Sequence, residues 1–192
     1  MRGESNLFEI FFMYQTEPIR QPFSEETEMP EEIFKMPRMG KAEYDGLVEE
    51  QYVCRIAFKG ETHPYIAPFL YVFDGRFMYF LSTNYGKKVQ YFRDNPFVTV
   101  EIEHFSPDLS AFSFVALPGR LVQVEGAGQK RAVRERFVHL IKSKALSTSV
   151  LSALGHSPQE PVEVLLQEEK SSVWKLVGVK ANEILGLKSQ KF

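Results

Sequence analysis

The chain has 192 residues, of which 44% are hydrophobic and 25% are charged, a composition typical of a soluble folded domain and unlike that of a disordered chain. Its formal net charge of -2 gives no indication of the concentrated positive charge on which nucleic-acid binding depends, so no nucleic-acid partner is expected. The single cysteine, Cys54, excludes an intramolecular disulfide and a cysteine-rich metal site. A lone thiol suits the cytoplasm, where we expect the protein to act.

Residues 1–37 differ in composition from the rest of the chain. The apolar run of residues 7–14 is interrupted by Glu9 and is too short to span a membrane. Four prolines between residues 18 and 37 exclude a long helix. We therefore expect an N-terminal extension over residues 1–37, packed through its aromatic side chains on the main domain or on a partner subunit. Residues 38–192 are expected to form one domain.

The first half of this domain is predicted to be a helix followed by a three-stranded meander. Tyr44, Leu47 and Val48 recur at helical spacing among charged residues, which predicts a short amphipathic helix. Runs of β-forming residues then predict three strands, joined by turns at Gly60-Glu61 and Asp74-Gly75. The helix is expected over residues 41–50 and the strands over residues 52–59, 63–73 and 76–81.

The second half adds helices and further strands. Asn95-Pro96 ends one predicted helix, and a second helix continues in regular or broken form to residue 155. The exposed face of this second helix is expected to be basic and solvated, with Lys130, Arg131, Arg134 and Arg136. Pro118-Gly119 predicts a bulge or bend, and Trp174 is expected to be a core or interface anchor in the last strand. The helices are expected over residues 86–93 and 130–140, the strands over residues 97–105, 112–125 and 173–179, and a short apolar segment over residues 162–166. Six or seven strands without βαβ alternation indicate a mainly β, antiparallel barrel or sandwich.

A polar turn between a strand and a lysine-bearing helix is the first candidate for a binding site. Ser82 and Thr83 offer hydroxyl groups, the helix start offers free N–H groups, and Lys87 and Lys88 supply positive charge. This combination predicts a cradle for one terminal phosphate. The same kind of turn also caps helices that bind no ligand.

Pro68 is the second candidate feature. Proline cannot donate to a β-ladder, so the strand that contains Pro68 is expected to have a free edge or a bulge there. Neighbouring N–H and C=O groups would then be available to a ligand. A flavin ring requires such an edge of donors and acceptors beside an apolar wall.

With these motifs in place, the stretch from Arg38 to Glu103 resembles the FMN-binding split-barrel superfamily of pyridoxamine 5'-phosphate oxidase-like proteins, especially its nitroimidazole-resistance-type branch. Each motif is short, and their order along the chain makes the resemblance specific. The matching residues are Arg38, Glu43, Pro64-Tyr65-Ile66-Ala67-Pro68, Asp74-Gly75, Tyr79-Phe80, Ser82, Gly86-Lys87-Lys88 and Asn95-Pro96.

The resemblance implies a six- to seven-stranded antiparallel split barrel that forms a homodimer, with FMN in clefts between the subunits. One strand would lie along the flavin ring, the polar turn would hold the phosphate, and the other subunit would contribute a later strand. The implied FMN-binding residues are Tyr65, Ile66, Ala67, Pro68, Phe69 and Leu70 on the first strand, Ser82, Thr83, Lys87 and Lys88 at the phosphate, and Ser113 and Phe114 on the later strand.

The implied function is that of an FMN-dependent oxidoreductase acting on a small organic substrate, with no protein side chain identified as the catalyst. The chain ends Gly186-Leu187-Lys188-Ser189-Gln190-Lys191-Phe192 and lacks the Arg-x-His motif of true pyridoxamine-phosphate oxidases, so we do not expect that activity. A non-catalytic flavin carrier or sensor, and a barrel that binds FAD, deazaflavin or haem, are the alternatives. Four scattered histidines show no metal-ligand spacing, and no metal is expected.

Overall fold

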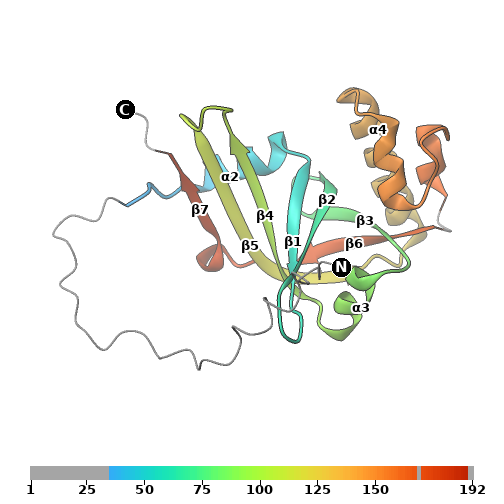
Figure 1. The fold of residues 1–192 in the computed structure, drawn as a ribbon, viewed down its shortest axis with the longest axis horizontal. Helices are drawn as coiled ribbons and strands as arrows, with labels where there is room; N and C mark the ends of the chain where they lie inside the picture. The colour runs from blue at the N-terminus through green and yellow to red at the C-terminus, as the bar shows by residue number, and fades with distance from the viewer. Residues whose placement is uncertain (1–34, 168–169, 190–192) are drawn as a thin grey trace, which may run out of the picture. The chain divides into compact units, whose positions relative to one another are not determined.

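The computed structural model describes residues 35–167 and 170–189, so nearly all of the expected N-terminal extension lies outside the described residues. The described strands form one antiparallel sheet in the order β4-β1-β2-β3-β6-β5-β7, and a further pairing of β4 with β5 closes the first six into a barrel (Figure 1). The strands are β1 (Val53–Phe58), β2 (Tyr65–Phe73), β3 (Met78–Thr83), β4 (Phe97–Phe105), β5 (Phe112–Gln123), β6 (Ser171–Val177) and β7 (Leu185–Lys188).

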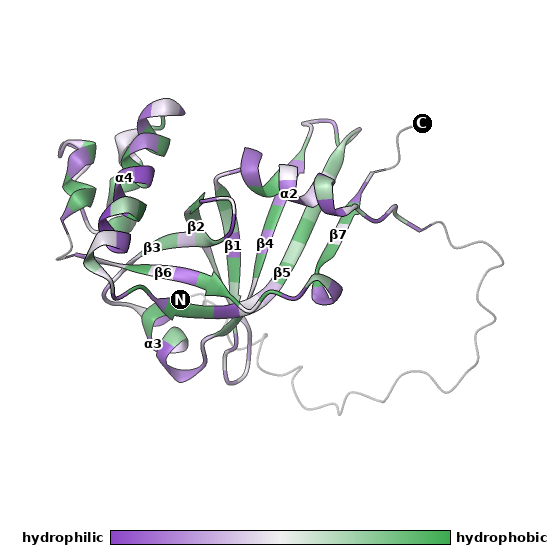
Figure 2. Cartoon of the chain, turned by 180° about the vertical axis from the view of Figure 1, so that it is seen from behind, coloured by the Kyte–Doolittle hydropathy of each residue, from purple (hydrophilic) through white to green (hydrophobic). Residues whose placement is uncertain are grey.

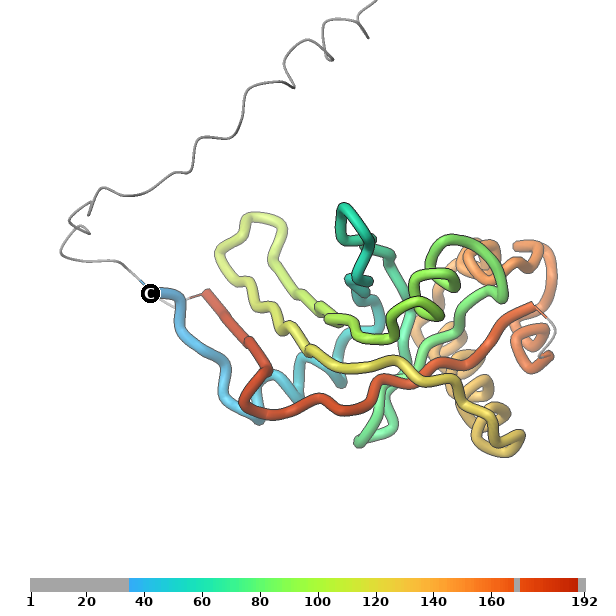
Figure 3. The backbone as a smooth tube through the Cα atoms, turned by 90° about the horizontal axis from the view of Figure 1, so that it is seen from below, coloured from blue at the N-terminus to red at the C-terminus, as the bar shows by residue number. Residues whose placement is uncertain are grey.

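Helices occupy the ends and one outer face of the barrel. In Figure 3 the long helix α4 and the turns that follow it gather at one end, and the β4–β5 hairpin and β7 extend at the other. No helix among the described residues is long and apolar enough to span a membrane. The helices are α2 (Lys41–Glu50), α3 (Lys87–Asp94), α4 (Ala127–Ser143) and the 3-10 helices η1 (Thr148–Leu154), η2 (Val162–Leu166) and η3 (Ala181–Glu183).

Two apolar cores hold these elements together. The first fills the barrel, where Trp174 is 1% exposed and its ring centroid lies 4.6 Å from that of Phe92. This confirms the prediction that Trp174 is a core residue. The second core lies outside the barrel wall, between β2, β3 and β6 and the segment from α4 to η2. It contains Phe137, Leu151 and Leu165, and Figure 2 shows the matching alternation of hydrophobic and hydrophilic stretches along α4.

The strand and helix predictions hold closely in the first half of the domain and less well toward its C-terminus. The helix over residues 41–50 and the strand over residues 97–105 are confirmed with their exact bounds. Residues 162–166 form a 3-10 helix, and the strand expected over residues 173–179 is not the last, because β7 follows it and pairs with β5. A four-residue strand with a glycine at its second position carries little local β signal.

Of the bulge or bend predicted at Pro118-Gly119, the bulge is wrong. β5 pairs with β4 without interruption, and Pro118 lies opposite Thr99. The proline is tolerated because its nitrogen faces the edge of β5 that lies away from β4. On that edge Pro118 falls between the residues that pair with β7 and those that pair with β6, so no ladder bond is lost. Gly119 has a different role, since a Cβ atom there would lie 2.9 Å from the Val177 carbonyl oxygen and 2.9 Å from Leu176 Cδ1.

Gly119→Ala is therefore expected to destabilise the protein by about 2 kcal/mol, because β6 must move away from the added methyl group. Gly128→Ala is the matched control: nothing lies within 4 Å of its added Cβ, and helix α4 should gain about 0.5 to 1 kcal/mol. Chemical denaturation of both variants measures the two changes. Equal stability of Gly119→Ala and the wild type would contradict the close approach of β5 and β6.

Candidate functional site

The first half of β2 has one unpaired edge. Tyr71 donates its N–H to the Tyr52 carbonyl at 3.0 Å, on the β1 side. Because successive residues of a strand point their backbone groups to opposite sides, Ile66, Pro68 and Leu70 direct theirs away from β1. β3 pairs with β2 over Tyr71–Phe73, so the edge before Tyr71 has no strand neighbour in the part of the chain that the structure describes. The missing N–H of Pro68 therefore costs no ladder bond, as the sequence predicts for a free edge.

The side chains of this half-strand alternate between the barrel interior and its outer face. Ala67 and Phe69 are buried in the barrel core, and Tyr65 packs against it with its ring 5.2 Å from Tyr91. Ile66 is 60% exposed, and Pro68 is exposed beside it. Of the six residues predicted to line a flavin ring, only alternate ones present their side chains on the outer face. The others could contribute through their backbone alone.

Lys88 lies at the end of this free edge. Its ammonium group is 5.5 Å from the centroid of the Phe69 ring, and desolvation by burial lowers its pKa. No ion pair joins Lys88 to a carboxylate among the described residues. A half-buried ammonium without an anionic partner is a site at which an anion would bind favourably.

A hollow of about 70 Å³ surrounds the Lys88 side chain. Pro68, Phe69 and Leu70 line one side of it, and Val150 and Leu154 line the other. The sequence did not single out this η1 wall, although the apolar spacing of residues 150, 151 and 154 is the signal that identifies a packed face. Sites for drug-sized ligands usually measure about 300 Å³ or more, so the hollow can take a phosphate but not a flavin ring.

Ser82 and Thr83 are buried at the end of β3, where their hydroxyl groups stabilise the turn before α3. Ser82 Oγ donates to the Thr83 carbonyl at 3.1 Å, and Thr83 Oγ1 donates to the Tyr85 carbonyl at 3.0 Å. Gly86, with φ of 95°, then opens α3, and Lys88 is its second residue. The two hydroxyls thus fix the path of the turn, and either would have to rotate to donate to a phosphate.

The two lysines of the motif face different hollows. Lys87 is exposed and lines a hollow beside the β1–β2 hairpin, together with Lys59, Glu61 and Asp94. Lys88 lines the hollow beside Phe69. Successive helix residues point about 100° apart, so adjacent lysines cannot share one face. Within this chain the structure brings Lys88, and not Lys87, to the free edge of β2.

Ser113 and Phe114 lie on β5, opposite His104 and Glu103 of β4. They line a separate hollow of about 520 Å³ at the β4–β5 hairpin, together with exposed Phe105 and Leu109. Among the described residues this hollow is separate from the one that Lys88 lines. Their predicted contact with FMN therefore depends on a second subunit.

A bound FMN would fit this site only in part within one chain. The phosphate fits the hollow at Lys88, because the ammonium there has no anionic partner among the described residues. The ring would lie outside the hollow, along the open face of Ile66 and Pro68, where the Leu70 N–H and the Ile66 and Pro68 C=O groups point. The polar edge of a flavin offers both acceptors and a donor to such groups.

Other candidate groups do not converge on this site. Cys54 is buried in the barrel, and burial raises the pKa of its thiol well above the ordinary value, so the thiol is unreactive. The described residues contain no cluster of three or more potential metal ligands. Arg134, which the sequence placed on a solvated basic face, is instead 1% exposed and donates to the Leu165 carbonyl at 2.8 Å.

The closed antiparallel barrel with its extra strand and short helices is a fold that this chain shares with solved structures. A sequence profile described as pyridoxamine 5'-phosphate oxidase matches residues 40–168. The chain therefore belongs to the pyridoxamine 5'-phosphate oxidase family. No match was found among the curated proteins.

Several solved structures share the fold at low sequence identity. A FAD-binding protein from Mesorhizobium loti has a TM-score of 0.60 at 15% identity, over 82% of this chain and 100% of its own. The haem storage protein of Vibrio cholerae has a TM-score of 0.54 at 11% identity, over 79% of this chain and 98% of its own. A putative 5-nitroimidazole antibiotic resistance protein from Bacteroides thetaiotaomicron has a TM-score of 0.50 at 15% identity, over 84% of this chain and 99% of its own.

Proposed function

We propose that this protein is an FMN-binding oxidoreductase that acts on a small organic substrate. The observation that carries the proposal is the half-buried ammonium of Lys88, which has no ion-pair partner among the described residues and lies at the end of the free edge of β2. The family match over residues 40–168 supports a flavin as the ligand of this site. When bound, FMN would supply the redox chemistry.

The residues around Lys88 would bind and orient the cofactor. Lys88 would pair with the phosphate, and the turn that Ser82 and Thr83 stabilise would hold the start of α3 in place. The backbone of Ile66, Pro68 and Leu70 would fix the polar edge of the ring. The η1 wall would exclude water from the phosphate end of the site.

We also propose a homodimer, which would complete the ring site. Apolar side chains are exposed on the strands that the helices leave open, including Phe97 at 65% and Phe105 at 55%. A second copy that covered them could bring Ser113 and Phe114 of the partner subunit to the flavin. The cytoplasm is proposed as the compartment, because the lone thiol of Cys54 is buried and forms no disulfide.

A second candidate function is binding of FAD or haem without oxidoreductase activity. It is favoured by two proteins that share the fold, one described as FAD-binding and one as a haem storage protein. The open outer face at Ile66 does not discriminate among planar cofactors, whereas Lys88, which has no ion pair within residues 35–167 and 170–189, favours one that carries a phosphate. The two candidates therefore differ in the ligand retained and in whether it turns over.

An absorbance spectrum of the purified full chain, recorded before and after addition of FMN and desalting, tests the proposal. Retained bands near about 370 and 450 nm are expected, as for an oxidised flavin. Loss of the 450 nm band on addition of NADH or NADPH, and its return with a quinone or nitroaromatic acceptor, would support an oxidoreductase. Retained flavin without reduction by either donor would support a carrier. A protein that retains haem and no flavin would overturn the assignment.

A further inference from the structure

The outer face of strands β1, β2, β4, β5 and β7 holds most of the exposed apolar side chains among the described residues. Strand register places alternate residues of these strands on this face, and their neighbours point into the barrel core. Of the nine large hydrophobic side chains that are exposed in the described part of the chain, five lie here: Val53, Ile66, Phe97, Phe105 and Leu185. Such a concentration marks a protein–protein interface, so this is the face that the proposed second copy would cover.

One charged cluster interrupts this apolar face. Arg55 of β1 lies opposite Glu101 of β4, and directly paired residues of neighbouring strands present their side chains on the same side of the sheet. Glu103 lies two residues further along β4 and therefore on the same side. Arg55 Nη1 is 2.5 Å from Glu103 Oε1 and 3.4 Å from Glu101 Oε2. One guanidinium thus pairs with two carboxylates, and the cluster keeps one negative charge in excess when all three groups are ionised.

The excess charge is already unfavourable in the single chain. Desolvation by burial and the neighbouring Glu103 carboxylate raise the pKa of Glu101, and together they outweigh the attraction of Arg55. The β5 residue opposite Glu101 is Ala116, which offers no charge. The Glu101 side chain is still 29% exposed, so water compensates part of its charge. A partner that covered the cluster would remove this water.

A symmetric second copy would bring the same excess of negative charge. Two identical chains usually associate through the same patch on both, so each would bury its own Arg55, Glu101 and Glu103. The other charged residue at the outward positions of β1, β4 and β5 is Arg120, which lies opposite Phe97. Phe97 is four residues from Glu101, or roughly 13 Å along the strand, so Arg120 does not compensate Glu101 within one chain.

We propose that dimerisation of this chain takes up protons at the cluster of Arg55, Glu101 and Glu103, so that the dimer becomes more stable as the pH falls. The inference rests on the proposed homodimer. A carboxyl group that loses water in the dimer binds its proton more tightly there than in the single chain. The dimer then binds more protons than two separate chains, and linkage strengthens association as the pH falls. This window lies above the pKa of Glu101 in the single chain, which itself exceeds 4.5.

Sedimentation velocity of the full chain over a range of pH tests the proposal. We expect the dissociation constant of the dimer to fall at least about tenfold from about pH 8 to about pH 5.5, because each copy can take up a proton. The Glu101→Gln side chain cannot ionise. This variant should dimerise at the higher pH about as tightly as the wild type does at the lower pH, and should lose most of the pH dependence.

A matched control separates this effect from a change in net charge. Glu49→Gln removes the same charge from an exposed position on α2, outside this face, and should keep the pH dependence of the wild type. A wild-type dimer with the same dissociation constant at every pH would overturn the inference and leave the homodimer standing. So would weaker dimerisation of Glu101→Gln than of the wild type at the higher pH, which would mean that Glu101 pairs with a cation such as Arg120 of the partner subunit. A chain that stays monomeric at every pH would overturn the homodimer itself.

Discussion

Replacing Arg134 by methionine is expected to lower the free energy of unfolding by about 3 to 5 kcal/mol. The guanidinium of Arg134 is buried and donates to the Leu165 carbonyl at 2.8 Å, to Ser171 Oγ at 3.0 Å and to the Ser171 carbonyl. These bonds join α4 to the end of η2 and to the start of β6. Methionine replaces most of the apolar stem, so the expected loss comes mainly from two buried carbonyls left without a donor.

Denaturant unfolding measures this loss, and Arg131→Met on the same helix is its control. Arg131 is exposed and pairs with Glu135 one turn away, so its removal should change stability by less than about 0.5 kcal/mol. If Arg134→Met also changed stability by less than 1 kcal/mol, the guanidinium would not be the link between α4 and β6. The same link holds the segment that carries the η1 wall, so flavin retention should also fall.

The sequence predicted those elements whose signals are local. Residues 41–50 and 97–105 were predicted with exact bounds, because each has one buried and one exposed face and the spacing of apolar residues shows it directly. Pro68 was also a local signal. Because proline has no N–H group, its strand needs a free edge at that residue, whichever strands it pairs with. Six of the seven strands of the antiparallel sheet follow from such local signals and from the tight turns between them, whereas β7 does not.

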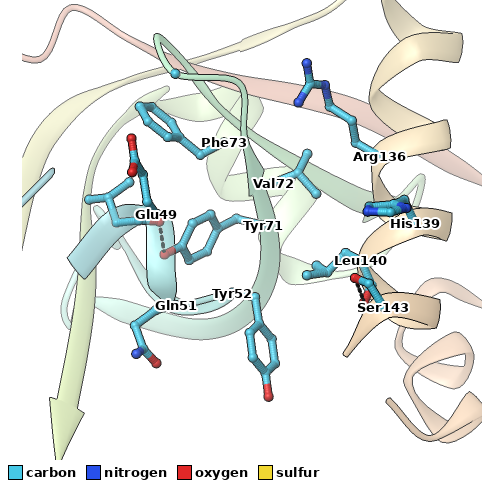
Figure 4. Close-up of a pocket in the computed structure, with 12 residues that line it drawn as sticks. Glu49, Gln51, Tyr52, Tyr71, Val72, Phe73, Arg136, His139, Leu140 and Ser143 are labelled. Atoms are coloured by element: carbon cyan, nitrogen blue, oxygen red, sulfur yellow. Dashed lines mark hydrogen bonds between the residues drawn. The ribbon is translucent and has the colours of Figure 1, made fainter. Parts of the chain in front are cut away.

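Features that depend on contacts between distant segments were not predicted. In the sequence, Arg134 resembles the exposed basic residues beside it on α4. Only the fold brings the carbonyl groups of Leu165 and Ser171 against its guanidinium. The η1 wall becomes part of the Lys88 site only because the fold brings residues 150–154 to β2. A hollow lined by Glu49 and Arg136 brings the end of α2 close to α4 (Figure 4), although more than eighty residues separate the two positions in the sequence. The spacing of apolar residues does not indicate that proximity. These are effects of tertiary packing, which a single sequence reveals poorly.

Lys88→Met is expected to have opposite effects on the FMN-bound and FMN-free protein. Burial lowers the pKa of Lys88 below its ordinary value of 10.5, and no described carboxylate compensates the charge. The folded state therefore binds fewer protons than the unfolded state between the lowered pKa and 10.5, so the FMN-free wild type gains stability as pH rises through that window. Methionine lacks this dependence and should match or slightly exceed the wild type at neutral pH.

With FMN the order reverses, because the phosphate supplies the anion that the buried ammonium lacks. We expect Lys88→Met to weaken FMN binding by about 30- to 100-fold, the equivalent of roughly 2 to 3 kcal/mol for a charge-assisted pair. Lys87→Met, which removes the same charge from the adjacent residue but from a different hollow, should weaken it less than about threefold. Fluorescence titration of FMN measures both constants. Equal losses would mean that the two lysines attract the phosphate by net charge alone. A loss confined to Lys88→Met would identify the hollow beside Phe69 as the phosphate site. Lys88 is the lysine of the motif whose charge is unfavourably desolvated without a ligand.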